Sequence, residues 1–232
     1  MSDQHAHDGH SHDDHGHEHG DGHEHPHEHP GMETQEELTW AARRFRAIEA
    51  LLEEKGICTW DEVTESVQMA EARSPSDGAR VVARAWVDPD FKKRLLEDPS
   101  KAVSELGYEL PPNGARLEVY ENTDDQHHMV VCTLCSCYPR SLLGRPPDWY
   151  KSISYRSRAV NDPRGVMKEF GYELPEQVGV EVHDSTADLR YIVLPKRPEG
   201  TEGWTEEQLA ALATRDSMIG VTAARRPTAS AV

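Results

Sequence analysis

Hydrophobic residues between positions 32 and 76 recur every three or four residues, which is the spacing of a helix with one apolar face. In the first helix these positions are Leu38, Ala41, Ala42, Phe45, Ile48, Leu51 and Leu52. Thr34 followed by Glu37 has the spacing of a capping box, and Gly56 is placed to end the helix. An apolar stripe without a core of its own has to pack against the rest of the chain or against another subunit.

From residue 77 onward the pattern changes, and one segment of it occurs twice. Asp98-Pro99 leads to the segment ELGYELP at 105–111, and Asp162-Pro163, at a distance of 162 − 98 = 64 residues, leads to EFGYELP at 169–175. Each copy has the pattern of a helix stopped by glycine, an alternating strand and a second apolar strand. The predicted strands are 117–120 and 129–131 in the first copy, and 180–183 and 191–194 in the second.

These elements predict an α+β fold, with a helical N-terminal arm followed by a layered αββα-type domain that contains an internal helix–strand–strand repeat. The arm is expected at 32–76, the metal-binding catalytic domain at 77–222 and a flexible C-terminus at 223–232. His183 lies on the polar side of its predicted strand and is expected to be exposed.

Residues 1–30 differ in composition from everything that follows. They contain eleven of the 14 histidines and eight acidic residues, without Lys or Arg. Such a segment cannot bury enough apolar surface to fold, so we expect a disordered tail at 1–31. The tail could chelate a divalent ion and make the protein a metal carrier, or it could only solubilise the chain. Imidazole affinity follows the Irving–Williams order and does not select one particular metal.

The formal net charge of −17 argues against nucleic acid as a partner. The first 30 residues contribute −8 of it, which leaves −17 + 8 = −9 for the rest. Four cysteines without framework spacing, and no apolar segment near the start, predict a cytoplasmic protein with neither a signal peptide nor a membrane span.

Three of the four cysteines, Cys132, Cys135 and Cys137, fall within six residues. A structural zinc site normally takes four side chains, one more than this loop offers, and thiolates also accept other transition metals. The backbone nitrogens of Ser136 and Cys137 could bind beside the three thiolates, giving five ligands and one open position. Such amidate ligands require a hard trivalent ion such as Co(III) or Fe(III). Spacing alone leaves structural zinc, an open catalytic site and redox or disulfide use as alternatives.

The segment VCTLCSCYP at 131–139 resembles the metal-binding signature of the nitrile hydratase alpha subunit in its cobalt form, which has Thr and Tyr where the iron form has Ser and Thr. The resemblance extends over about residues 34–221. It includes PPDWYK at 146–151, DPR at 162–164, RYIVLP at 190–195, RPEGTEGW at 197–204 and TRDSMIGV at 214–221. The gamma subunit of thiocyanate hydrolase shares the cysteine motif and is the nearest alternative.

This resemblance implies a hydro-lyase that hydrates a nitrile to the corresponding amide at a low-spin Co(III) centre, one per chain, with Fe(III) less favoured. Cys132 would be the axial thiolate. Cys135 and Cys137 would lie in plane with the amide nitrogens of Ser136 and Cys137. Cys135 would be oxidised to a sulfinate and Cys137 to a sulfenate, which are known oxidation states of reactive thiolates. Thr133 and Ser136 complete the set of catalytic loop positions.

The resemblance also implies a beta subunit, in one chain or split into two, in a heterodimer or a larger heteromer. In the family, arginines of the beta subunit bind the oxidised cysteines, and the helical arm would wrap around that partner. Within this chain Arg190 could orient an oxidised cysteine or form an ordinary salt bridge. Trp149, Tyr150 and Tyr155 are expected in an aromatic core or an interface.

Two positions depart from the family pattern. Cobalt nitrile hydratases usually carry Trp after the Tyr-Pro of the motif, where this chain has Arg140, as thiocyanate hydrolase does. Asn113 aligns with the family's pocket glutamine and is one methylene shorter. Tyr138, Arg140 and Asn113 are therefore the expected substrate-pocket residues, and a polar or heterocyclic nitrile is a plausible substrate.

Overall fold

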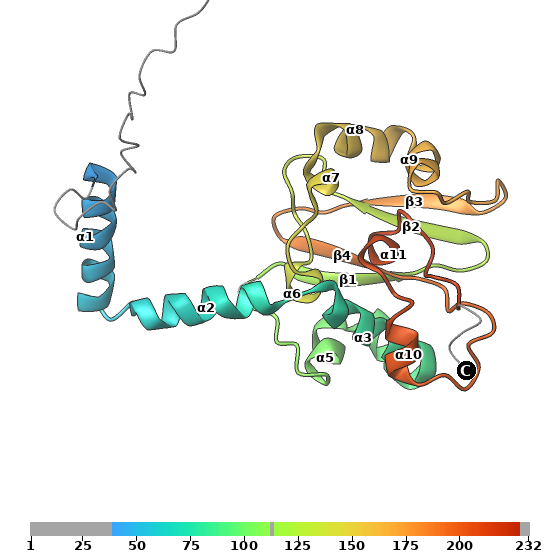
Figure 1. Cartoon of the computed structure of the whole chain (residues 1–232), viewed down its shortest axis with the longest axis horizontal. Coiled ribbons are helices and arrows are strands. Elements are labelled where there is room, and N and C mark those ends of the chain that lie inside the picture. Colours follow the sequence, from blue (N-terminus) through green and yellow to red (C-terminus); the bar gives the residue numbers. More distant parts are fainter. Residues whose placement is uncertain (1–38, 112–113, 228–232) are drawn as a thin grey trace, which may run out of the picture. The chain divides into compact units, whose positions relative to one another are not determined.

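The computed structural model describes residues 39–111 and 114–227, which belong to two compact units (Figure 1). The first unit ends at Lys55, and its described part is helix α1 (Trp40–Glu54). The side chain of Thr39 caps this helix by accepting a hydrogen bond from the backbone nitrogen of Ala42. The expected tail at 1–31, the Thr34 cap and Asn113 lie outside the described residues.

The second unit, Gly56–Val232, contains the remaining described helices. They are α2 (Trp60–Ala72), α3 (Pro75–Val87), α4 (Pro89–Glu97), α5 (Pro99–Ser104), α6 (Arg140–Leu143), α7 (Asp148–Lys151), α8 (Ile153–Asn161), α9 (Pro163–Glu169), α10 (Glu206–Ala210) and α11 (Arg215–Ile219). The Asp-Pro pairs of the repeat start α5 and α9. In each, the aspartate side chain caps the helix and proline occupies the first turn, where a missing N–H costs nothing.

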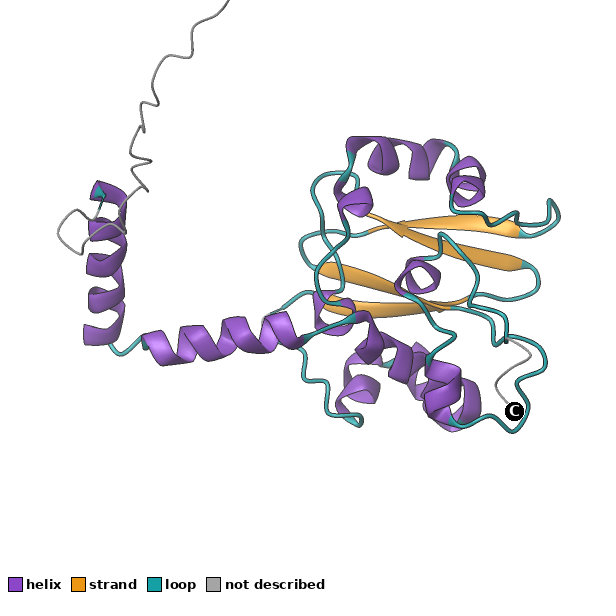
Figure 2. Cartoon of the chain, in the orientation of Figure 1, coloured by secondary structure: helices purple, strands orange, loops and turns teal. Residues whose placement is uncertain are grey.

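Four described strands form two parallel pairs between the helices (Figure 2). They are β1 (Arg116–Glu121), β2 (Gln126–Val131), β3 (Gly179–Asp184) and β4 (Leu189–Leu194). Strand β1 pairs with β4, and β2 pairs with β3. The mixed helix–strand class expected from the sequence is confirmed, whereas its finer description as a layered αββα domain stays a prediction.

The two copies of the repeat make equivalent contacts. Arg94 pairs with Glu105 in the first copy, and Arg158 pairs with Glu169 in the second. The glycine after each helix has a positive φ, 81° at Gly107 and 78° at Gly171. The next residue of each copy then donates a backbone hydrogen bond back to the helix, from Tyr108 N to Val103 O (3.1 Å) and from Tyr172 N to Met167 O (2.9 Å). Each strand pair joins one strand of each copy, so the two copies are interlocked rather than placed side by side.

Strand β2 lies in the core and positions the loop that follows it. Met129, Val130 and Val131 are fully buried, and the Tyr155 hydroxyl of α8 donates a 2.6 Å hydrogen bond to the Val130 carbonyl. Helices α8 and α9 lie on one side of the strands in Figure 1, and α3 and α10 on the other. None of the helices within 39–111 and 114–227 has the length and apolar character needed to cross a membrane.

Candidate metal centre

The three cysteines of the loop Cys132–Cys137, here called the cysteine loop, converge on one point at the end of β2. The Sγ atoms of Cys132 and Cys135 lie 3.5 Å apart, and those of Cys135 and Cys137 lie 3.3 Å apart. The backbone nitrogen of Cys135 also donates to the Cys132 sulfur over 3.3 Å. Cys132 is buried and Cys135 is exposed, so the sulfur cluster opens outward.

These separations fit three thiolates around one ion. With metal–sulfur bonds of about 2.3 Å, two sulfurs lie about 3.3 Å apart at a right angle and about 3.8 Å apart at a tetrahedral angle. The observed distances of 3.3 and 3.5 Å are closer to the right-angle value, which is typical of octahedral coordination. The donor set therefore fits the open site better than it fits tetrahedral zinc.

The thiols influence one another's ionisation. Hydrogen bonds from the Cys137 and Cys132 thiols, followed by the Ser136 backbone, lower the pKa of Cys135 to about 7. Burial, together with hydrogen bonding to Cys135, raises the pKa of Cys137 to about 12, against the opposing charge of Arg190. The Cys135 thiol thus ionises before the Cys137 thiol, and a thiolate is both a metal ligand and a target of oxidation.

Three side chains from distant parts of the sequence hold the cysteine loop. Asp184, at the end of β3, accepts hydrogen bonds from the Thr133 backbone nitrogen (2.9 Å) and hydroxyl (2.5 Å). The buried Tyr150 hydroxyl donates to the Cys137 carbonyl (2.8 Å), and Arg156 of α8 donates to the Cys135 carbonyl (3.1 Å). Sequence reasoning placed Tyr150 only in an aromatic core or interface, and it missed Asp184 and Arg156.

The expected pocket residues Tyr138 and Arg140 lie beside the cysteine loop. Together with Arg190 they line a cavity of about 190 Å³. The Tyr138 ring is buried, and Arg140 begins the short helix α6. Arg190 donates to the Leu189 carbonyl over 3.1 Å and is close enough to lower the pKa of Cys137.

Other candidate ligands lie elsewhere. Cys58 precedes helix α2 and is not grouped with the loop sulfurs. The His127 ring contacts the Gly220 carbonyl (2.7 Å) and the Asn122 amide (3.1 Å). The expectation that His183 is exposed was wrong: only 6% of it is exposed, because the Tyr120 ring stacks on it. Strand alternation did not reveal this neighbour from β1.

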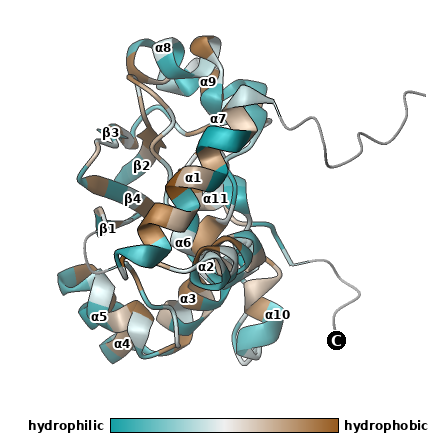
Figure 3. Ribbon diagram, turned by 90° about the vertical axis from the view of Figure 1, so that its left-hand side faces the viewer, coloured by the Kyte–Doolittle hydropathy of each residue, from teal (hydrophilic) through white to brown (hydrophobic). Residues whose placement is uncertain are grey.

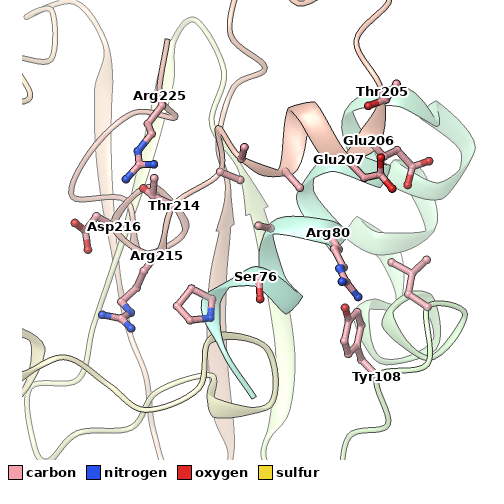
Figure 4. A pocket seen from close by; sticks show the side chains of 16 residues that line it. Ser76, Arg80, Tyr108, Thr205, Glu206, Glu207, Thr214, Arg215, Asp216 and Arg225 are labelled. Atoms are coloured by element: carbon pink, nitrogen blue, oxygen red, sulfur yellow. The ribbon is translucent and has the colours of Figure 1, made fainter. Parts of the chain in front are cut away.

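A larger cavity, of about 1130 Å³, lies between α3, α10 and α11 (Figure 4). Arg80 and Tyr108 lie on one side of it, and Arg215 and Arg225 on the other. None of its lining residues belongs to the cysteine loop. The sulfur cluster is therefore found outside this cavity.

Comparison with known proteins identifies the family. The family model described as nitrile hydratase, alpha chain, matches residues 39–222. The low-molecular weight cobalt-containing nitrile hydratase subunit alpha of Rhodococcus rhodochrous is 52% identical over 187 residues, covering 80% of this chain and 90% of that protein. Thiocyanate hydrolase subunit gamma of Thiobacillus thioparus is 43% identical over 185 residues, covering 75% of this chain and 76% of that protein.

Solved structures agree with this result. A double-histidine mutant of the Fe-type nitrile hydratase from Comamonas testosteroni Ni1 superposes with a TM-score of 0.70 at 40% identity, covering 84% of this chain and 98% of that chain. The family expected from the cysteine motif is thereby confirmed, with thiocyanate hydrolase gamma as a relative. The chain belongs to the nitrile hydratase alpha-chain family, a family of enzyme subunits.

Proposed function

We propose that this chain is the metal-carrying subunit of a cobalt nitrile hydratase, which hydrates a nitrile to the amide at a Co(III) centre. The observation that carries the proposal is the convergence of three sulfurs, with Sγ separations of 3.5 Å between Cys132 and Cys135 and 3.3 Å between Cys135 and Cys137. Support comes from the 52% identity to a relative named as cobalt-containing. Co(III) accepts thiolate and amidate ligands together, which matches the donors of the cysteine loop.

The cysteine loop would supply all the protein ligands of the metal ion. The Cys132, Cys135 and Cys137 thiolates, together with the amide nitrogens of Ser136 and Cys137, would hold the ion and leave one position open. The bound ion supplies Lewis-acid activation of the nitrile or of water. The chain itself fixes the loop through hydrogen bonds to the Thr133, Cys135 and Cys137 groups, so that the donors need little rearrangement on binding.

Oxidation of the loop is part of the proposal. Because Cys135 ionises before Cys137 and is exposed, we assign it as the thiol that becomes the sulfinate, with Cys137 as the sulfenate; dissolved dioxygen would be the oxidant and the source of the added oxygens. Both oxidised groups carry negative charge and need charge-assisted partners. Arginines of a partner subunit would supply these, with Arg190 of this chain at the edge of the site.

A partner subunit is also indicated by exposed apolar side chains. Leu134, inside the cysteine loop, is 87% exposed, and Ile153 and Val160 of α8 are exposed as well. Large apolar side chains gathered around a reactive centre mark a contact surface. Relatives of this chain are named as subunits, and we propose that a beta subunit covers this surface and completes the substrate pocket.

The decisive test is to produce the chain with its partner subunit in cobalt-rich medium. We expect conversion of nitriles to amides, and a Cys132–Cys137 peptide whose mass shows added oxygen. Tetrahedral zinc with unmodified sulfurs would overturn the proposal. Omitting the partner is the matched control and should abolish activity.

A second candidate function is hydrolysis of thiocyanate to carbonyl sulfide and ammonia. Arg140 beside Tyr138 favours it, since a cation at the pocket edge suits an anionic substrate. Release of ammonia from thiocyanate, with no turnover of nitriles, would establish this function instead of the first. Arg140→Trp, which restores the usual residue of cobalt nitrile hydratases, should then abolish the thiocyanate reaction.

The histidine-rich segment 1–30 supports a third candidate, a metal carrier. Deleting Met1–Pro30 separates it from an enzyme. An enzyme matured in cobalt-rich medium keeps its activity after the deletion, whereas a carrier loses its bound cobalt.

A further inference from the structure

Two buried histidines and a carboxylate form a second cluster of metal-ligating side chains, away from the cysteine loop. The cluster consists of His128 on β2, and Glu181 and His183 on β3. His128 pairs with Glu181 in the parallel register, and His183 lies two residues farther along β3. All three side chains therefore project from the same face of the strand pair.

The ligand atoms of the cluster are close together. His128 Nδ1 lies 2.8 Å from His183 Nε2 and 3.8 Å from a Glu181 carboxylate oxygen. The two histidines are 8% and 6% exposed, whereas the Glu181 side chain is 57% exposed. The two buried nitrogens thus lie next to an exposed carboxylate, on whose side water could fill the remaining positions around an ion.

The rings are held in place before any ion binds. Tyr120 of β1 stacks on His183, with ring centroids 3.9 Å apart, and lies 5.2 Å from the His128 ring. Tyr191 of β4 lies beside both rings, 5.1 Å from His183 and 5.9 Å from Tyr120. A ligand set fixed by packing loses less conformational freedom on binding than one on a flexible loop does.

The electrostatics of the cluster suit a cation. Burial, as the largest cause, lowers the pKa of His128 and of His183. Because His128 Nδ1 and His183 Nε2 share a hydrogen bond, one of these two nitrogens carries a proton, and binding of an ion requires that this proton move to the other nitrogen of the same ring. Glu181 acts on both histidines, and Glu118 acts on His183, in the direction that favours positive charge. Two neutral nitrogens beside two carboxylates form a site of net negative charge.

We propose that His128, Glu181 and His183 bind a divalent first-row transition ion of the Ni²⁺ or Cu²⁺ type, separately from the metal of the cysteine loop. With metal–nitrogen bonds of about 2.1 Å, two nitrogens lie about 3.0 Å apart at a right angle and about 3.4 Å apart at a tetrahedral angle. The observed 2.8 Å, a hydrogen-bonding contact between the two rings, is nearer to the right-angle value, which is the arrangement of square-planar or octahedral sites rather than tetrahedral zinc.

This site would act on the cysteine loop through β3. His183 directly precedes Asp184, which holds the Thr133 backbone and hydroxyl. An ion that ties β2 to β3 at His128 and His183 restrains the strand end that carries Asp184. The second site thus serves as a brace for the first, without sharing a ligand with it.

The test uses the full chain assembled with its partner subunit and matured with cobalt, and the probe is Ni²⁺ alone. Because residues 1–30 also offer histidines to Ni²⁺, the readout has to be local: amide hydrogen exchange of the peptides that cover β2 and β3. We expect Ni²⁺ to slow exchange at least tenfold in these strands. His183→Gln should abolish this protection, and Glu181→Gln should weaken the apparent Ni²⁺ affinity about tenfold.

Glu173→Gln is the matched control, since Glu173 is another exposed carboxylate and pairs only with the exposed Lys168 in the described contacts. This substitution should leave the Ni²⁺-dependent protection of β2 and β3 unchanged. If His183→Gln does not fold, the exposed Glu181 position carries the test. Equal apparent Ni²⁺ affinity in wild type and in Glu181→Gln, or no protection by Ni²⁺ in the wild type, would overturn the proposal. Protection by Zn²⁺ but not by Ni²⁺ would overturn the assigned class of ion.

Discussion

Arg156 makes a contact whose chemistry depends on the metal. Its guanidinium donates to the Cys135 carbonyl, which belongs to the same peptide group as the Ser136 nitrogen. If that nitrogen binds as an amidate, the negative charge spreads onto the carbonyl oxygen that Arg156 contacts. A charge-assisted hydrogen bond contributes about 1.5–3 kcal/mol, which corresponds to about ten- to hundredfold in affinity.

We therefore expect Arg156→Ala to lose bound cobalt about ten- to hundredfold faster than wild type during dialysis against a chelator. Metal content per chain is the measurement. Arg158→Ala is the control on the same helix, because Arg158 forms ion pairs with Asp162 and Glu169 only and does not contact the loop in the described contacts. Equal cobalt retention in the two variants would show that Arg156 does not stabilise the ligand.

The cysteine loop itself could be predicted at the residue scale, because its donors lie within six positions of one another. Its supports could not. Arg156 is 21 residues from its partner in the sequence, and Asp184 is 51 residues from Thr133. Such contacts depend on where α8 and the end of β3 lie in the fold, and spacing along the chain does not encode that.

At the scale of elements, the packing of α11 on β2 depends on a single glycine. Gly220 ends α11 with φ of +84°, and a Cβ there would lie 2.0 Å from the His128 carbonyl oxygen. Gly171 has a similar φ of +78°, but a Cβ added at Gly171 would have no atom within 4 Å of it. The two sites share the backbone strain, and only Gly220 adds a collision with a strand.

Gly171→Ala should cost about 1–2 kcal/mol of unfolding free energy, which is the cost of a left-handed backbone for a residue with a side chain. Gly220→Ala should cost about 1–3 kcal/mol more, because β2 has to shift to relieve the contact. Urea unfolding of both variants gives the difference. Similar losses in the two variants would mean that α11 can move away from β2 without penalty.

The strands were predictable, but their partners were not. Alternation of apolar and polar positions identified β1 and β3, and short apolar runs identified β2 and β4, since both patterns report which faces of a strand are buried. They do not report which strand lies beside which. The repeat suggested two similar units, whereas β1 pairs with β4 and β2 with β3, across the copies. The pairing of β2 with β3 places His183 beside His128, and Tyr120 of β1 stacks on His183. The buried histidine cluster could therefore not be predicted from the sequence.

At the scale of the whole molecule, the proposed partner subunit has a candidate contact surface on helix α1. No residue of α1 is buried, although it carries large apolar side chains, and brown and teal segments alternate along it in Figure 3. Ile48 is 53% exposed and Leu51 is 47% exposed. Fully burying two aliphatic side chains contributes about 3–6 kcal/mol in total, which is enough to decide whether two subunits associate.

The double variant Ile48→Asp, Leu51→Asp should therefore weaken association with the partner subunit by at least about a hundredfold, because two carboxylates would have to be desolvated where aliphatic groups were buried. Analytical ultracentrifugation of the mixed subunits measures this. The second unit should unfold at the same urea concentration as in wild type, since α1 belongs to the other compact unit. Ala50→Asp, which adds charge to the opposite side of the helix, is the control and should associate normally. If the double variant also associates normally, α1 does not form the interface, and the apolar surface around Leu134 is left as the candidate.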